Sequence, residues 1–262
     1  MSLCGILLAA CKGGSAGERA GGDADKVLRR AMADSTDWPS YGRDYTNQRF
    51  SPLSQITPTN APQLKLAWRY KTGIPNSFEA SPVVIDGTMY VSTPLNHVVA
   101  LDAATGAKKW EYGHQYQTSS TVHCCGAVNR GVAVYGGRVY MGTLDARLVA
   151  LDARTGEKVW EQQIADNTKG YAVNGPIIAV DGKVLVGTSG GEYGIRGFIE
   201  ARDAKDGKQV WRWYTIPSPE DGGWWGKWRE TDPFGVRLNR NISREKADSA
   251  KHADAWQRGG GG

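Results

Sequence analysis

The sequence predicts an all-β fold, an incomplete β-propeller of about four blades, and three observations support this prediction. A segment that ends in tryptophan recurs along the chain, and the terminal tryptophans of its three full copies lie 50 and 51 residues apart. Glycine (34 residues), tryptophan (10) and tyrosine (11) are frequent, which suits short strands joined by tight turns. No long helical period occurs before residue 240.

The repeat has the pattern of one propeller blade. Three copies align, at residues 98–110, 148–160 and 199–211, and residues 64–68 are a degenerate earlier copy. An Asp-Gly or Gly-Gly pair and an alternating strand precede each full copy, and such pairs supply the positive φ of a hairpin turn. A repeat of this length with four strands in each copy is typical of blades.

Two side chains in each copy have predictable structural roles. In the first copy, Asp102 is expected to accept hydrogen bonds from backbone N–H groups of the turn that Thr105 and Gly106 close. Trp110 follows on the next strand and is expected to wedge between neighbouring sheets. The repeats therefore predict both the turns within a blade and the contacts between blades.

The N-terminus differs in composition from the repeats. Residues 1–11 end in Leu-Ala-Ala-Cys, which fits the lipobox of a bacterial signal peptide, although a positive n-region is missing. We therefore expect a periplasmic protein that Cys11 anchors to a membrane through a lipid; the alternative is an inert leader. Residues 12–36 are small, polar and charged and are expected to form a flexible tether, whereas residues 37–262 hold the propeller. Within them, the charged stretch 240–258 is expected to include a short helix.

The net charge of +5 does not indicate a nucleic-acid partner, because lysines and arginines are interleaved with acids and no binding motif appears. After the N-terminus, no run of 18 apolar residues indicates a membrane span. The sequence has no Ser-His-Asp set, no P-loop and no dinucleotide fingerprint, and its four histidines lack metal-ligand spacing. These observations argue against a Ser-His-Asp hydrolase, a P-loop nucleotide-binding enzyme, a dehydrogenase with a dinucleotide-binding fingerprint and an enzyme with a histidine metal site.

Cys124 and Cys125 are adjacent, and they are the only cysteines after the leader. This is not the composition of a disulfide scaffold. Adjacent cysteines either close a strained ring through a disulfide or remain two reduced, partly buried thiols. From the residues alone, both alternatives stay open.

Several motifs accompany the repeats. They are Trp38-Pro-Ser-Tyr-Gly-Arg-Asp44, His123-Cys-Cys125 followed by Asn129-Arg-Gly131, and Ser189-Gly-Gly-Glu-Tyr-Gly-Ile-Arg-Gly197. Together with the Ala-Leu-Asp-Ala-x-Thr-Gly-x-x-x-Trp repeats, they resemble the family of alcohol and methanol dehydrogenases that depend on pyrroloquinoline quinone (PQQ). The resemblance extends over residues 37–262 and implies quinoprotein repeats in an eight-bladed ring, of which these residues supply the N-terminal part.

The resemblance implies two cofactors, PQQ and calcium (Ca2+), with a lanthanide as the alternative cation. It implies that eight residues bind PQQ, which are Glu79, Cys124, Cys125, Arg130, Asn174, Ser189, Gly190 and Gly191. It also implies that Glu192 ligates the cation and that the two adjacent cysteines form a disulfide against one face of the quinone. Asn174 stands where relatives often have threonine, which also donates a hydrogen bond.

The chemistry of these side chains agrees with such roles. A guanidinium such as that of Arg130 pairs a carboxylate through two hydrogen bonds, and PQQ carries three carboxylates. A hard cation takes carboxylate and carbonyl oxygens, and the glycines beside Glu192 allow backbone to approach a ligand closely. The alternatives are that Glu192 is an ordinary exposed turn residue and that Glu79 is a surface carboxylate at a strand end.

The resemblance implies an oxidoreductase that oxidises a small alcohol with PQQ and passes electrons to a c-type cytochrome. No aspartate in this chain matches the family's catalytic base, which is expected beyond Gly262, so the 262-residue chain is expected to be inactive by itself. Two alternatives share the repeats: a propeller lipoprotein that acts as a scaffold for outer-membrane protein assembly, and a sugar-oxidising quinoprotein. The adjacent cysteines and the motif at residues 189–197 favour the alcohol dehydrogenase.

Overall fold

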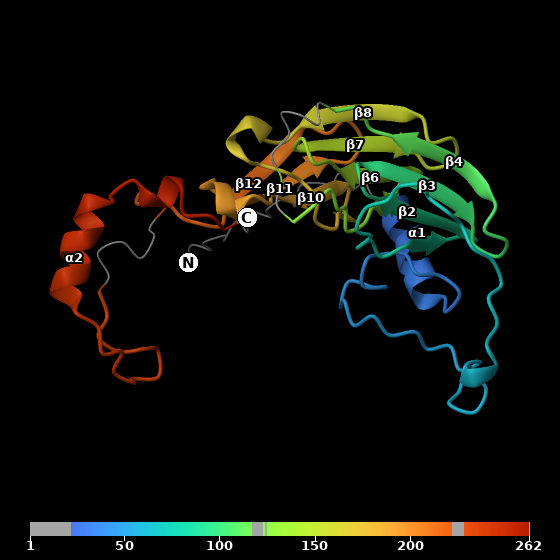
Figure 1. Ribbon diagram of the computed structural model, residues 1–262, viewed down its shortest axis with the longest axis horizontal. Coiled ribbons are helices and arrows are strands. Elements are labelled where there is room, and N and C mark those ends of the chain that lie inside the picture. The colour runs from blue at the N-terminus through green and yellow to red at the C-terminus, as the bar shows by residue number, and fades with distance from the viewer. Residues whose placement is uncertain (1–21, 117–122, 124, 222–227, 262) are drawn as a thin grey trace, which may run out of the picture.

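The computed structural model describes residues 22–116, 123, 125–221 and 228–261. Its strands form three four-stranded antiparallel sheets, each built from strands that are consecutive in sequence, and we call these sheets blades 1, 2 and 3 (Figure 1). Blade 1 contains β1 (Val83–Ile85), β2 (Thr88–Thr93), β3 (His97–Asp102) and β4 (Lys108–Gly113). Blade 2 contains β5 (Ala133–Tyr135), β6 (Arg138–Gly142), β7 (Arg147–Asp152) and β8 (Lys158–Gln163). Blade 3 contains β9 (Ile178–Val180), β10 (Lys183–Gly187), β11 (Phe198–Asp203) and β12 (Gln209–Tyr214).

The turns within a blade form as the sequence predicts. Between β1 and β2, Asp86 and Gly87 have φ values of 48° and 68°, in the left-handed region that glycine and aspartate tolerate. Between β3 and β4, Asp102 Oδ1 accepts hydrogen bonds of 2.8–3.2 Å from the N–H groups of Ala104 and Thr105 and from the Thr105 hydroxyl. Both turns therefore follow from local residue choice.

Trp110 wedges between blades 1 and 2, as the sequence predicts. Its indole N–H donates to the carbonyl of Ala153 at 2.9 Å, and its ring lies against Gly156, whose φ is 76°. Trp160 makes the same contact with blade 3, where Gly207 receives the ring. Because a side chain at either glycine would clash with the indole, each tryptophan and the glycine of the next blade form a matched pair.

The degenerate copy at residues 64–68 forms no strand in the described structure, yet Trp68 occupies the equivalent place. Its indole N–H donates to the carbonyl of Ala103 at 3.2 Å, and its ring lies against Gly106. Three blades are therefore complete sheets in the described residues, and the earlier copy contributes its tryptophan.

The hydrophobic core lies between the blades. One buried cluster joins blades 1 and 2 and includes Val83, Trp110 and Leu151. A second cluster joins blades 2 and 3 and includes Tyr140 and Phe198. Four consecutive residues are buried in β3 and again in β7, which shows that both faces of these strands are covered.

The helix α1 (Gly22–Ala33) corrects the expectation of a flexible tether over residues 12–36. Leu28 and Ala31 lie on one helix face and are buried, and α1 packs against β5 at the inner side of the blades (Figure 1). Asp25 Oδ1 also accepts a 3.0 Å hydrogen bond from a backbone N–H of the β9–β10 turn. A narrow apolar stripe is enough to order a polar helix when an existing core receives it.

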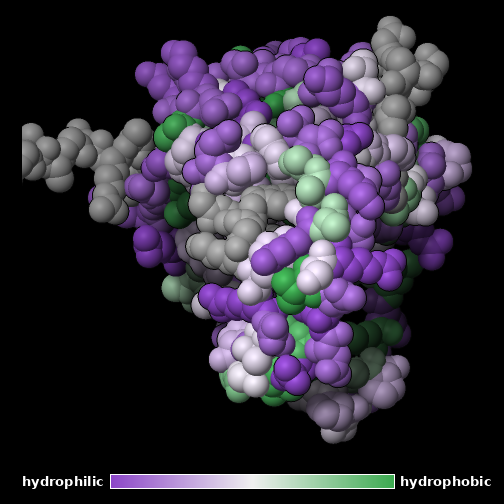
Figure 2. Space-filling model, turned by 90° about the vertical axis from the view of Figure 1, so that its left-hand side faces the viewer, coloured by the Kyte–Doolittle hydropathy of each residue, from purple (hydrophilic) through white to green (hydrophobic). Residues whose placement is uncertain are grey.

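The helix α2 (Ile242–Lys251) lies within the charged stretch that is expected to include a helix, and it projects away from the blades (Figure 1). The side of the molecule that carries α2 is mostly hydrophilic, as Figure 2 shows. None of the helices in the described ranges has the length and apolar character needed to cross a bilayer. The expected signal peptide and lipobox (1–11) and the tether residues 12–21 lie outside the described residues. Short 3-10 helices occupy Ala61–Gln63, Asn167–Lys169, Gly191–Tyr193 and Ala255–Gln257.

Candidate functional site

The predicted site residues gather at one end of the blades. The two turns of each repeat lie at the other end, where for example Ala103 N–H donates to the carbonyl of Gly87 at 2.9 Å. The segments that enter β1, β5 and β9 therefore lie at the opposite end, together with the β2–β3, β6–β7 and β10–β11 connections, and we call this the loop end. Every predicted site residue in the described part of the chain belongs to these segments.

Glu79 and Arg130 form an ion pair between the entries to blades 1 and 2. Glu79 Oε2 lies 3.1 Å from Arg130 Nη2, and both side chains are partly exposed. The carbonyl of Arg130 accepts a hydrogen bond from Ser81 N–H, and Arg130 N–H donates to the carbonyl of Asn174 at 3.0 Å. The backbone of Arg130 is thus tied to the entries of blades 1 and 3, which holds its guanidinium at the loop end.

The β10–β11 loop begins with a pairing to the segment before β9. Ser189 and Ala172 form an antiparallel bridge with N–H···O distances of 2.9 and 3.1 Å, and Ser189 Oγ also donates to the Ala172 carbonyl at 3.2 Å. Gly190 has a φ of 117°, and a Cβ at this position would overlap the carbonyl oxygen of Gly170. Gly190 is therefore required by contact with the protein's own backbone, a reason that the sequence did not reveal.

Glu192 lies in the same loop, within the 3-10 helix Gly191–Tyr193. Its side chain is exposed and forms no ion pair with any other described residue. In the part of the chain that the structure describes, no three His, Cys, Asp or Glu side chains gather as a metal site. A hard cation accepts carboxylate, carbonyl and amide oxygens and water, so the Glu192 carboxylate is of a type that could ligate one.

Cys125 is exposed, has a φ of 65° and is disulfide-bonded. Cys124 lies outside the described residues, so the bridge between the two cysteines stays a prediction. His123 beside them is half-buried, and its Nδ1 is buried without a hydrogen-bond partner among the described residues. All three residues belong to the same connection between blades 1 and 2 as Arg130.

Asn129 has a structural role at the site that the sequence did not reveal. It is buried, its Nδ2 donates to the carbonyl of Gly142 at 2.8 Å, and its Oδ1 accepts from Gly131 N–H at 3.1 Å. These bonds shape the turn that presents Arg130. The Asn-Arg-Gly motif marked this position, but only the fold shows that the asparagine supports the arginine.

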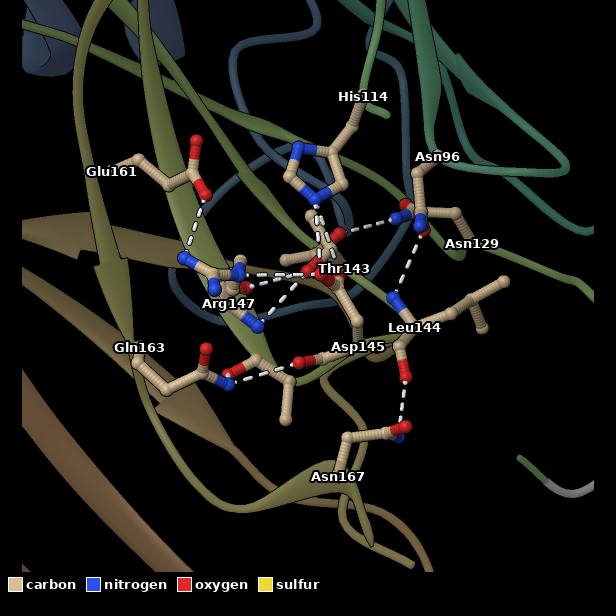
Figure 3. Close-up of polar contacts among 12 residues, drawn as sticks. Asn96, His114, Asn129, Thr143, Leu144, Asp145, Arg147, Glu161, Gln163 and Asn167 are labelled. Carbon is tan, nitrogen blue, oxygen red and sulfur yellow. Dashed lines mark hydrogen bonds and ion pairs between the residues drawn. The ribbon is translucent and has the colours of Figure 1, made fainter. Parts of the chain in front are cut away.

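A second polar cluster lies at the loop end around the β6–β7 connection (Figure 3). His114 Nε2 lies 3.2 Å from Asp145, and Arg147 pairs with both Asp145 (3.2 Å) and Glu161 (2.8 Å). Burial by itself would raise the pKa of Asp145, but hydrogen bonds to His114 and Thr143 outweigh burial and hold this pKa below its usual value. The cluster thus joins the end of blade 1 to blade 2.

Comparisons with known proteins agree with one another. A family model described as the β-propeller domain of PQQ glucose, ethanol and alcohol dehydrogenases matches residues 38–236. A quinohemoprotein alcohol dehydrogenase of Pseudomonas putida is 40% identical over 257 residues, which cover 98% of this chain and 35% of that protein. The lanthanide-dependent methanol dehydrogenase of Methylorubrum extorquens is 38% identical over 242 residues, which cover 91% of this chain and 39% of that protein.

A solved structure gives the same result. The crystal structure of the quinohemoprotein alcohol dehydrogenase of Comamonas testosteroni superposes with a TM-score of 0.70 at 37% sequence identity. The match covers 93% of this chain and 36% of that one. The chain thus spans only 35% and 39% of the lengths of the two curated relatives named above.

Proposed function

The chain belongs to the family of PQQ-dependent alcohol dehydrogenases with a β-propeller domain, and from this premise we propose that its loop end binds PQQ and one cation for the oxidation of an alcohol. One observation carries the proposal. The ion pair of Glu79 and Arg130 is joined by a backbone hydrogen bond to Asn174, so the entries of all three blades are linked at this end. Residues that are far apart in sequence thus form one contiguous group, which supports a shared ligand.

The donors in this group suit a flat, anionic ring. PQQ carries three carboxylates, and Arg130 offers the planar, charged N–H donors that pair with carboxylates. Asn174 adds an amide, whereas the Ser189 hydroxyl donates to the Ala172 carbonyl in this structure and would have to turn in order to donate to a ligand. Because the Glu79 carboxylate already orients the guanidinium, less entropy is lost when a ligand carboxylate binds.

Glu192 is proposed to ligate the cation. Its exposed carboxylate has no ion-pair partner among the described residues, and the Gly191 carbonyl beside it adds an oxygen of the kind that Ca2+ and lanthanides accept. Because one relative is named a lanthanide-dependent enzyme, both Ca2+ and a lanthanide are included in the proposal. When bound, the two cofactors would supply a Lewis acid and an acceptor for the hydride of the alcohol.

The proposal extends to location and partners. A periplasmic setting would be oxidising and would maintain a disulfide between Cys124 and Cys125. Residues 1–11 would direct the chain there, with Cys11 as the site of a lipid anchor. Relatives named quinohemoproteins combine a quinone and a haem in their names, which supports a c-type cytochrome as electron acceptor.

The scaffold alternative is not favoured. The relatives reported above are named dehydrogenases, and the family model is that of a PQQ domain. A propeller that acts only as a scaffold would need neither the fixed guanidinium of Arg130 nor a carboxylate that, like that of Glu192, forms no ion pair with the residues the structure describes. It would show no saturable binding of PQQ.

A titration tests the proposal. The whole protein that contains this chain is titrated with PQQ in the presence of CaCl2 or LaCl3, and quinone absorbance is followed until it saturates. Arg130→Met removes a charge-assisted pair worth about 1.5–3 kcal/mol and should therefore raise the Kd for PQQ by at least tenfold. Glu192→Gln should remove the dependence of PQQ binding on the cation.

Arg138→Met is the matched control for these variants. Arg138 also bridges two blades, because its Nη1 donates to the carbonyls of Ala204 and Lys205. It does so at the end of the blades opposite the loop end, where the two turns of each repeat lie, and we call this the turn end. Its replacement should leave the Kd for PQQ unchanged. Absence of saturable binding by the wild-type protein, or equal loss of affinity in both arginine variants, would contradict the proposal.

A further inference from the structure

Arg196 connects the β10–β11 loop to two later segments of the chain. Its Nε donates to the carbonyl of Ile216 at 2.9 Å, and its Nη2 forms an ion pair with Asp221 at 3.0 Å. The guanidinium also contacts two aromatic rings, with its Cζ 3.8 Å from the centre of Tyr214 and 4.5 Å from the centre of a Trp256 ring. The side chain is only 15% exposed, so its contacts, rather than water, set its position.

The backbone makes the same connection. Gly260 N–H donates to the carbonyl of Ile195 at 2.9 Å, and Gly197 N–H donates to the carbonyl of Gly260 at 2.9 Å. A Cβ at Gly260, whose φ is 82°, would lie 3.5 Å from the carbonyl oxygen of Gly191. Residues 256–261, which we call the clasp, therefore lie directly against the loop that carries the candidate cation ligand.

Tyr171, which precedes the β10–β11 loop in the chain, also holds that loop. Its hydroxyl accepts a hydrogen bond from Arg196 N–H at 3.2 Å and donates to the Arg196 carbonyl at 3.0 Å. The Tyr171 ring in turn packs against Phe198, with 5.9 Å between ring centres. The backbone at Arg196 is thus fixed by blade 3 and its entry segment, while the Arg196 side chain reaches the clasp.

These contacts matter for Glu192 because its own side chain is exposed and pairs with no described residue, so the backbone of the loop sets its position. The loop contains two glycines with positive φ, Gly190 and Gly194, and its middle rests on Gly170, which contacts Gly190 and Tyr193. The contacts at the two ends of the loop complete this support. Ser189 fixes one end through its bridge to the segment before β9, and Arg196 fixes the other.

We propose that Arg196 is a positioning residue: by holding the clasp against the β10–β11 loop, it places the Glu192 carboxylate for a cation. This inference rests on the proposed function, in which Glu192 is a cation ligand. It also implies that cation binding and docking of the clasp are coupled. If the docked clasp raises the affinity for the cation by some factor, the bound cation stabilises the docked clasp by the same factor. Groups that orient a metal ligand typically change metal affinity by about 10–100-fold when they are removed.

The test combines two measurements on full-length protein. Arg196→Met keeps an apolar stem over the two rings but removes the charge and all hydrogen-bond donors. Hydrogen exchange without cofactors reports the order of residues 189–197 and of the clasp, and a calorimetric titration with CaCl2 in the presence of PQQ reports cation affinity. Arg196→Lys restores the charge without the planar donors, and Arg138→Met again serves as the control at the turn end.

We expect Arg196→Met to speed exchange in residues 189–197 and in the clasp and to weaken Ca2+ binding by about 10–100-fold. Arg196→Lys should recover part of this loss, and Arg138→Met should change neither readout. Unchanged exchange in residues 189–197, or Ca2+ affinity within twofold of wild type, would overturn the inference.

Failure of the proposed function would be recognised separately. If the wild-type protein binds neither PQQ nor Ca2+, the proposed function fails and the role of Arg196 toward a cation fails with it; hydrogen exchange then decides only whether Arg196 holds the loop. Faster exchange of residues 189–197 in Arg196→Met would still support positioning of the Glu192 loop by Arg196. Wild-type exchange in that variant would overturn it.

Discussion

Replacing Gly156 by alanine tests whether adjacent blades are held together by a tryptophan seated on a glycine. Gly156 has a φ of 76°, and a Cβ there would lie 2.5 Å from Cε3 and 2.7 Å from Cδ2 of Trp110. Trp110 is only 8% exposed, and its N–H is bonded to Ala153 at 2.9 Å. The indole therefore cannot move aside without losing burial and its hydrogen bond.

Two costs add at this position. The left-handed conformation costs an alanine about 1–2 kcal/mol, and overpacking of a buried contact costs about 1–3 kcal/mol. Gly156→Ala should therefore lower the free energy of unfolding by about 2–5 kcal/mol. Gly87→Ala is the matched control, because Gly87 has a φ of 68° but no heavy atom lies within 4 Å of the place that a methyl group would take, so only the first cost applies.

The assay is equilibrium unfolding in guanidinium chloride, followed by circular dichroism. The difference between the two alanine variants isolates the contact with the indole and should be about 1–3 kcal/mol. In a Trp110→Leu background, where the ring is absent, this difference should shrink towards zero. Equal destabilisation by Gly156→Ala and Gly87→Ala, or a difference that persists without the ring, would refute the reasoning.

Three further predictions concern buried polar groups. Asp145→Asn should cost about 1.5–3 kcal/mol at pH 7; because the pKa of Asp145 is lowered in the folded state, its contribution is present above the ordinary value of 3.8 and is lost as the pH falls through the lowered pKa. The melting temperature of this variant should therefore fall less steeply than that of the wild type as the pH is lowered below 3.8, and an equally steep fall would contradict the assignment. Burial raises the pKa of Tyr135 to about 12, so its contribution is present below pH 10 and lost as the pH rises towards 12; Tyr135→Phe should abolish this alkaline loss in urea unfolding measured across that range. Glu200 is buried between two arginines, Arg202 and Arg212, and Glu200 and Arg202 stand where blades 1 and 2 have valine and leucine. Glu200→Val should destabilise by about 3–5 kcal/mol, and the added change Arg202→Leu should recover only the part of the loss that belongs to Arg202 in the same urea assay, because Arg212 still lacks its carboxylate; no recovery would contradict the repeat equivalence.

Features that depend on a few neighbouring residues could be predicted from the sequence. The Asp86-Gly87 turn and the hydrogen bonds of Asp102 follow from local backbone preferences, and the structure confirms both. The place of Trp110 between blades also followed from the sequence, because a fixed repeat puts the same residue in the same contact each time. In contrast, α1 was not predicted, since its order comes from the core that receives Leu28 rather than from its own polar composition.

For the candidate site, the sequence identified residues and the fold identified their contacts. Motifs singled out Glu79, Arg130 and Ser189, but the ion pair of the first two depends on how blades 1 and 2 are stacked. Likewise, the sequence suggests ligand approach as the reason for Gly190, whereas the structure shows that the Gly170 carbonyl occupies the space of a side chain there. No local pattern contains this information, because the partners come from different repeats.

The sequence by itself determined the repeating unit: its period, its turns, and the tryptophan that seats on the next blade. Only the tertiary structure decided which loops meet at one end, that α1 packs against β5, and that Arg196 joins the Glu192 loop to the clasp. The physical reason is that backbone conformation and periodicity are short-range properties of the chain. Contacts between distant segments are set by the packing of whole blades. That packing depends on many residues of several repeats at once, so no short stretch of sequence specifies it.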